Sequence, residues 1–219
     1  MKKKILVIML FVLMLCGCAT KEQKAFKKDY ESLNGKTNAS GKVHRTIKID
    51  SDNPFEKITG EELVKKFENK ETFYVYFGDE MCPWCRSVIE KFIEHAKKNN
   101  VTKVYYVDIW DKDGNEVFRD KYIVNDNKEL EQVNEGTEAY FKLMEYFDNV
   151  LSDYNITVGE EKVYANEKRI YAPNFMYVEK GVSIKKVDGI PAELTDPRGE
   201  LTTQVLKEED RIFNEFFTN

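Results

Sequence analysis

The chain has 219 residues, of which 42% are hydrophobic, and a formal net charge of −5 at pH 7. This length suits one compact domain with an elaboration. The acidic balance argues against nucleic-acid binding and against adhesion to anionic lipid through a basic patch.

The first residues have the features of an export signal. Residues 1–4 are basic, and the eleven residues of the apolar run from Ile5 to Leu15 are too few to span a hydrocarbon core of about 30 Å. The run ends in Leu-Cys-Gly-Cys18, which resembles a bacterial lipobox, whose last cysteine is lipidated. We therefore predict a lipoprotein signal peptide over residues 1–17 and lipidation of Cys18. An ordinary signal peptide or an uncleaved anchor is the alternative.

Residues 18–42 contain six lysines and two Asn- and Gly-containing clusters, a composition that predicts a flexible tether. Loss of the signal removes three lysines and no acid, so the net charge becomes −8. Membrane attachment would depend on the acyl chains alone. We expect a lipid-anchored protein on the extracytoplasmic face of the cell membrane, with its folded domain over residues 43–219.

Within this domain, apolar periodicity predicts alternating strands and helices. The predicted strands cover residues 43–49, 73–77, 103–109, 170–178 and 182–187, and the predicted helices follow a capping box at 59–62 and cover residues 86–98, 137–154 and 202–217. The last two strands should form a hairpin. Residues 110–136 are polar and should be mostly loop. The apolar stripe of the 137–154 helix favours packing on the core over a partner-binding face. The alternation predicts an α/β fold.

Two thiols, Cys82 and Cys85 in Cys-Pro-Trp-Cys, lie where a strand meets a helix. A helix N-terminus presents free N–H groups that stabilise a thiolate on the first cysteine. Cys16 and Cys18 leave with the signal or carry the lipid, so this pair holds the only thiols of the mature chain. The two histidines have no ligand-like spacing from it, so we expect no metal and no other cofactor. The pattern indicates a redox-active disulfide.

Two segments resemble the thioredoxin-like superfamily. Phe73–Arg86 (FYVYFGDEMCPWCR) is similar to its active-site segment, and Arg169–Val178 (RIYAPNFMYV) to its proline segment. The resemblance implies a thioredoxin fold, a central mixed sheet flanked by helices, with a helical insertion over about 110–160 before the cis-Pro strand. The chain is most similar to membrane-anchored or exported members of Gram-positive bacteria, including those called bacteriocin-transport accessory proteins.

The resemblance also assigns site residues. Pro173 matches the family's cis-proline, and Pro83, Trp84, Ala172 and Pro173 would line a substrate groove. Tyr76 stands where the family has a buried aspartate that moves protons. Asp79 and Glu80 are nearer the thiols but are expected in an exposed loop, so proton transfer would use water or one of these acids.

The sequence therefore predicts an exported, membrane-tethered thiol–disulfide oxidoreductase. Cys82 would attack protein disulfides and Cys85 would resolve the mixed disulfide. Pro-Trp is similar to the glutaredoxin dipeptide, which implies a potential between about −270 and −120 mV. The partners would be protein thiols or disulfides and a membrane or extracytoplasmic redox partner. Two alternatives stay open: an accessory binding module of an export or bacteriocin system with incidental redox activity, and a metal chaperone.

Overall fold

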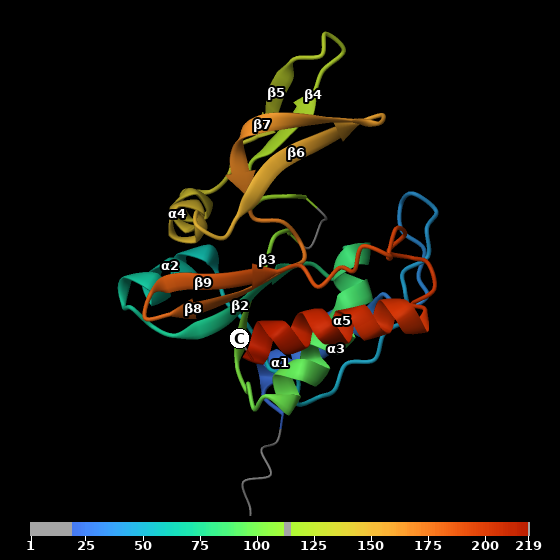
Figure 1. Cartoon of the computed structure of the whole chain (residues 1–219), viewed down its shortest axis with the longest axis vertical. Helices are drawn as coiled ribbons and strands as arrows, with labels where there is room; N and C mark the ends of the chain where they lie inside the picture. The colour runs from blue at the N-terminus through green and yellow to red at the C-terminus, as the bar shows by residue number, and fades with distance from the viewer. Residues whose placement is uncertain (1–18, 112–114, 219) are drawn as a thin grey trace, which may run out of the picture.

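The centre of the molecule is a five-stranded mixed sheet in the order β1-β3-β2-β8-β9 (Figure 1). The structure, a computed structural model, describes residues 19–111 and 115–218. The strands are β1 Phe55–Lys57, β2 Phe73–Gly78, β3 Val104–Asp108, β8 Asn174–Glu179 and β9 Val182–Val187. Strands β1, β3 and β2 are parallel, whereas β8 pairs antiparallel with β2 and with β9. The α/β class and the C-terminal hairpin are therefore confirmed.

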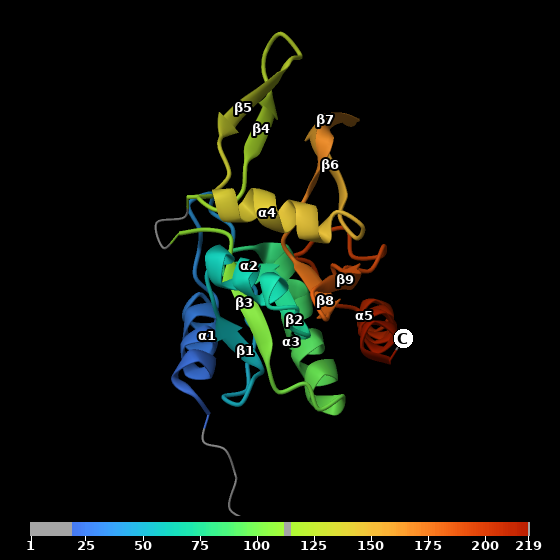
Figure 2. The ribbon, with the colours of Figure 1, turned by 90° about the vertical axis from the view of Figure 1, so that its left-hand side faces the viewer.

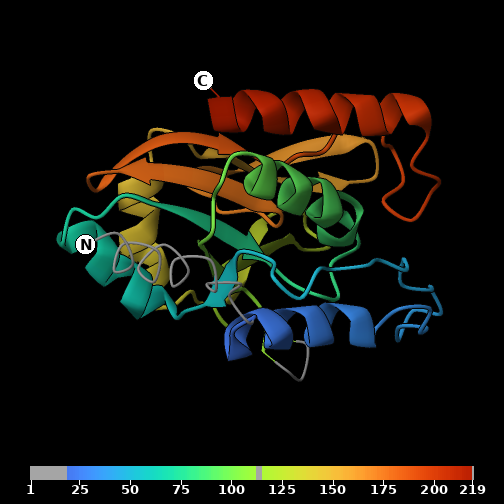
Figure 3. The same cartoon turned by 90° about the horizontal axis from the view of Figure 1, so that it is seen from below.

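Helices cover both faces of this sheet. They are α1 Lys21–Ser32, α3 Pro83–Lys98 and α5 Thr203–Thr218 on one face, and α2 Gly60–Glu68 and α4 Glu138–Phe147 on the other. Seen from below, α3 lies between α1 and α5 (Figure 3). The side chains of β2 alternate between the two cores, with Val75 and Phe77 on the α2 side and Tyr76 on the α3 side, all fully buried. A strand buried on both faces has a continuous apolar sequence, as β2 does.

The segment predicted to be a flexible tether is instead helical from Lys21, and this prediction is wrong. Thr20 and Gln23 form a reciprocal capping box at the start of α1. Phe26 and Tyr30, one helical turn apart, are buried in the core. Lysines cover the other faces of the helix. Because they dominate the composition of this segment, the composition did not reveal its short apolar face.

The strand predicted over residues 43–49 is also absent. Val43 forms only an isolated bridge with Thr37. This segment does not pair with a neighbouring strand. Its backbone is held by hydrogen bonds to side chains that lie in α1 or just after it. The Asn34 side chain donates to the Ile47 carbonyl at 2.8 Å and accepts from the Ile47 N–H at 3.1 Å, while Glu31 accepts from the Ile49 N–H at 2.8 Å. Ile47 and Ile49 are buried as a result.

The predicted helical insertion consists mainly of two β-hairpins, which extend from the core beyond α4 (Figure 2). Their strands are β4 Lys121–Val124, β5 Leu130–Asn134, β6 Ser152–Val158 and β7 Glu161–Arg169. The predicted 137–154 helix ends at Phe147, and its last residues belong to β6. Tyr154 fits the helical spacing by coincidence, since its ring packs under the Arg169 guanidinium, 4.1 Å from the ring centroid.

A buried hydroxyl pair joins α1 to the central strand. The Tyr30 and Tyr76 hydroxyl oxygens are 2.8 Å apart and both side chains are fully buried. Removing one hydroxyl leaves the other without this partner, at a cost of about 1–3 kcal/mol. We expect Tyr30→Phe and Tyr76→Phe each to lower the free energy of unfolding, and the double variant to lose less than the sum of the two. Urea unfolding of the wild type, the two single variants and the double variant measures this coupling. Strictly additive losses in the free energy of unfolding would contradict the coupling.

Candidate functional site: the Cys82–Cys85 dithiol

The two thiols lie at the start of α3, directly after β2. Cys82 is the N-cap residue and Pro83 the first helical residue, where a missing N–H costs nothing. The Cys85 N–H donates to the Cys82 sulfur at 3.3 Å. The cap position thus holds a sulfur atom where serine or aspartate oxygens usually accept this bond.

The environments of the two thiols differ. Both cysteines are free, Cys82 partly exposed and Cys85 fully buried. A hydrogen bond from the Cys85 thiol lowers the pKa of Cys82, helped by the backbone N–H groups of Cys85 and Trp84. Burial raises the pKa of Cys85 well above its ordinary value, and its contact with Cys82 adds to this effect. Cys82 is therefore the thiol that ionises first.

The proline segment lies opposite Cys82. The Ala172–Pro173 peptide bond is cis, as the resemblance implied. The Ala172 carbonyl oxygen is 3.6 Å from the Cys82 sulfur, and Pro173 is buried behind it. The structure thus brings Cys82, Pro83 and Ala172 to one cleft. Trp84 and Pro173, which the resemblance also placed in the groove, are not among the residues that line this cleft, since Trp84 is partly buried in α3 and Pro173 is buried.

Behind the thiols lies Tyr76, whose hydroxyl is within hydrogen-bonding reach of the Cys85 thiol and of Tyr30. Burial raises the pKa of Tyr76 well above its ordinary value, so the hydroxyl remains a neutral donor. Its ring fills the space beside Gly78, where an added Cβ would lie 2.1 Å from the Tyr76 hydroxyl oxygen. Glycine at 78 is therefore required by the ring of Tyr76.

Asp79 was expected in an exposed loop, and this expectation is wrong. The residue is 2% exposed. One carboxylate oxygen accepts from the N–H groups of Met81 at 2.6 Å and Cys82 at 3.1 Å. Burial, then the charges of Glu80 and Asp108, raise the pKa of Asp79 to about 7. A buried acid that titrates near neutrality next to a thiol pair is suited to proton transfer.

The carboxylates of Asp79, Glu80 and Asp108 offer oxygen atoms within 4.8 Å of one another. Hard cations prefer such ligands. Lys57 already lies 2.7 Å from Asp108, and the pKa values of Asp79 and Glu80 are both raised, chiefly by burial. Protonation and the charge of Lys57 therefore reduce the repulsion among these three carboxylates. We assign to this group of acids the role of setting the pKa of Asp79.

A cleft of about 700 Å³ opens around Cys82. One wall is formed by residues 38–40, from the segment predicted to be a tether, and by His44, from the segment predicted to be the first strand. Another, with Trp110, Arg119 and Tyr171, comes from the elaboration between β3 and β8. Neither wall could be recognised from the sequence, because both are brought to the thiols only by the packing of distant segments.

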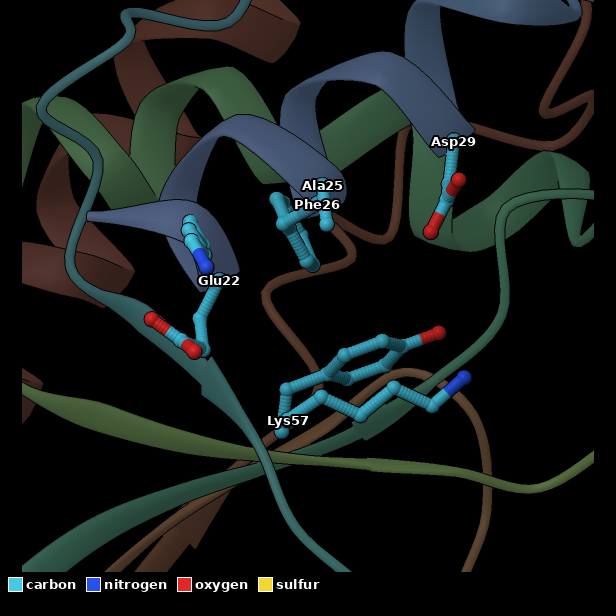
Figure 4. Close-up of a pocket in the computed structure, with 7 residues that line it drawn as sticks. Glu22, Ala25, Phe26, Asp29 and Lys57 are labelled. Carbon is cyan, nitrogen blue, oxygen red and sulfur yellow. The ribbon is translucent and has the colours of Figure 1, made fainter. Parts of the chain in front are cut away.

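A second hollow, of about 200 Å³, lies between α1 and the sheet edge (Figure 4). Glu22, Ala25, Phe26 and Asp29 line it from α1, and Lys57 lines it from β1. The Lys57 amine bonds to Asp108 rather than to the acids of α1. None of its described lining residues carries a thiol, and this hollow marks where α1 packs on the sheet.

No known family model matches the chain, and no curated protein is similar to it. Within residues 19–111 and 115–218, no helix has the length and apolar character needed to cross a bilayer. The predicted signal peptide, Cys16 and the predicted lipidation site Cys18 lie outside the described residues.

The raised pKa of Asp79 makes stability depend on pH. Because folding raises this pKa from 3.8 to about 7, the protonated acid favours the folded state. This contribution is complete below about pH 3.8 and is lost as the pH rises through 7. We expect Asp79→Asn, which stays neutral, to stabilise the protein at pH 8 by up to a few kcal/mol, at about 1.4 kcal/mol per pKa unit.

Urea unfolding at pH 4 and pH 8 measures this difference. The exposed Asp126→Asn variant is the control and should show little change at either pH. An equal effect of Asp79→Asn at both pH values would contradict the assignment.

Proposed function

We propose that this protein is a thiol–disulfide oxidoreductase of the thioredoxin-like type. One observation carries the proposal: a partly exposed thiol with a lowered pKa and a buried thiol with a raised pKa lie together at a helix N-terminus. Thiol–disulfide exchange needs this asymmetry, since the thiolate is the nucleophile and the second thiol must stay protonated until its turn. The strand order with an antiparallel β8 after the cis-proline supports a thioredoxin fold.

In the reducing direction, the Cys82 thiolate attacks a substrate disulfide and forms a mixed disulfide, releasing one substrate thiolate. Cys85 then gives its proton to the Asp79 carboxylate, directly or through water, and its sulfur attacks Cys82. The Asp79 N–H is within hydrogen-bonding reach of the Cys85 sulfur and favours the anion. The Cys82–Cys85 disulfide forms, the second substrate thiolate leaves and takes the proton, and two electrons have passed to the substrate. Oxidation of a substrate is the reverse sequence.

The place of action that we propose is the extracytoplasmic face of the membrane, with an anchor at Cys18. Because α1 begins at Lys21 and is packed on the core, such an anchor would hold the domain close to the bilayer. A membrane-bound redox partner could then reach the thiol pair and reset it. Mass spectrometry of the membrane fraction tests the anchor, and a mature chain without acyl groups would contradict it.

Replacement of each thiol separates the two roles. We expect Cys82→Ser to abolish reduction of protein disulfides and Cys85→Ser to accumulate mixed disulfides at Cys82, because the resolving thiol is then missing. Mass spectrometry of the trapped complexes would identify the substrates. The Ser32→Ala variant, at an exposed position outside the thiol site, is the control for the effects of substitution and purification and should keep full activity.

If Cys82→Ser keeps both its activity and its cellular phenotype, the enzyme proposal fails. A binding module of an export or bacteriocin system, with a redox pair that is incidental, would then be the better account. If the reduced protein binds a metal ion with one-to-one stoichiometry through the two thiols, a metal chaperone would be the better account.

A further inference from the structure

The lining of the Cys82 cleft has a charge opposite to that of the chain. The chain has a net charge of −5, yet three arginines, Arg119, Arg169 and Arg198, line this cleft, and among its described lining residues Asp79 is the single acid. Since the pKa of Asp79 is raised to about 7, much of its charge is absent at neutral pH. A cleft of one sign concentrates ligands of the other.

Two of these arginines are already engaged. Arg119 and Arg169 both form ion pairs with Glu116, and Arg169 also with Asp120. Arg119 further donates to the Ile170 carbonyl at 2.8 Å. These buried pairs form a fixed wall and leave little charge for a ligand.

Arg198 differs from them. Within the described part of the chain, no carboxylate lies within 4 Å of its guanidinium, and its buried Nε has no hydrogen-bond partner. Its backbone N–H is fixed by the Asp196 side chain at 2.9 Å, so the residue is held at the cleft. An unpaired guanidinium in the same cleft as a reactive thiol offers a planar fork of donors that fits a carboxylate.

His44 is the second unsatisfied group in the cleft. It is 6% exposed, and its Nδ1 has no hydrogen-bond partner. Burial, then the charges of Arg86 and Arg198, lower its pKa, so the ring is neutral at neutral pH. A polar atom that is buried without a hydrogen-bond partner destabilises the folded state. An anion beside Arg198 and His44 would offset part of this cost and favour the protonated ring.

We propose that Arg198 and His44 form a subsite for a carboxylate of the substrate, so that the preferred substrates are protein disulfides with an acidic side chain next to the reacting cysteine. This inference rests on the proposed function for the identity of its ligand. The cleft has room for a cysteine and its neighbours, since pockets of 300–1,000 Å³ enclose drug-sized molecules. Cys82 and the subsite share one cleft, so the acid must lie close to the cysteine in the substrate.

The first test measures binding without redox chemistry. Two short peptides contain S-methylcysteine next to either Glu or Gln, and each is added to the reduced protein. We expect the Glu peptide to bind about 5–10 times more tightly and to raise the pKa of His44 in an NMR titration. His95, which bonds to Asp210 at 3.1 Å in a different pocket, is the internal control and should not respond.

Two variants then locate the effect. Arg198→Gln should reduce the Glu-to-Gln affinity ratio to about 1, whereas Arg211→Gln, an exposed arginine of α5, should leave the ratio unchanged. An unchanged ratio in Arg198→Gln, or an unchanged His44 pKa with the Glu peptide, would overturn the subsite.

The second test uses the disulfide-linked dimers of the same peptides without methylation. Faster reduction of the Glu dimer than of the Gln dimer, lost in Arg198→Gln, supports the subsite. Equal reduction of both dimers overturns it but keeps the oxidoreductase. Selective binding without reduction of either dimer overturns the proposed function but keeps the subsite.

Discussion

The buried guanidinium of Arg86 holds together the parts from which the site is built. It is fully buried, and all five of its hydrogen bonds go to neutral oxygens, none to a carboxylate. They reach the Tyr30 carbonyl and the Asn34 side chain beside α1, the Arg45 carbonyl and the Glu80 carbonyl. A buried cation is costly unless such bonds satisfy it. The first turn of α3 therefore stays in place only when α1, the segment around Arg45 and the loop before Cys82 are all packed against it.

This constraint links the fold to the chemistry. Docking of α1 brings Tyr30 onto Tyr76, and Tyr76 in turn contacts the Cys85 thiol from within the core. The loop fixed by Arg86 buries Asp79, which accepts from the Cys82 N–H and so shares the helix start with the nucleophile. Burial acts on three groups in the same direction. It raises the pKa of Cys85 and Tyr76 well above their ordinary values and keeps both protonated, and it raises the pKa of Asp79 to about 7, where this acid can accept and return a proton. Cys82, at the helix N-terminus, is left as the thiol that ionises.

The elements that local periodicity defines were predictable: β2, α3, β3, the β8–β9 hairpin and α5 all lie close to their predicted ranges. The position of the thiols at a helix start was predictable for the same reason. What the sequence did not reveal depends on contacts between distant segments. Phe26 and Tyr30 make α1 part of the core, and a loop acid, Asp79, is buried because Arg86 holds its loop. The walls of the cleft, with His44 and Arg198, follow from the same packing.

The central claim is that the two thiols have opposite pKa shifts. The rate of alkylation by iodoacetamide, followed against pH on the native reduced protein with the modified cysteine located by mass spectrometry, tests it most directly. We expect modification of Cys82 alone, with an apparent pKa below the ordinary cysteine value of about 8.5, while Cys85 reacts only after unfolding. Alkylation of both cysteines at similar rates, or an apparent pKa of Cys82 above that value, would contradict it.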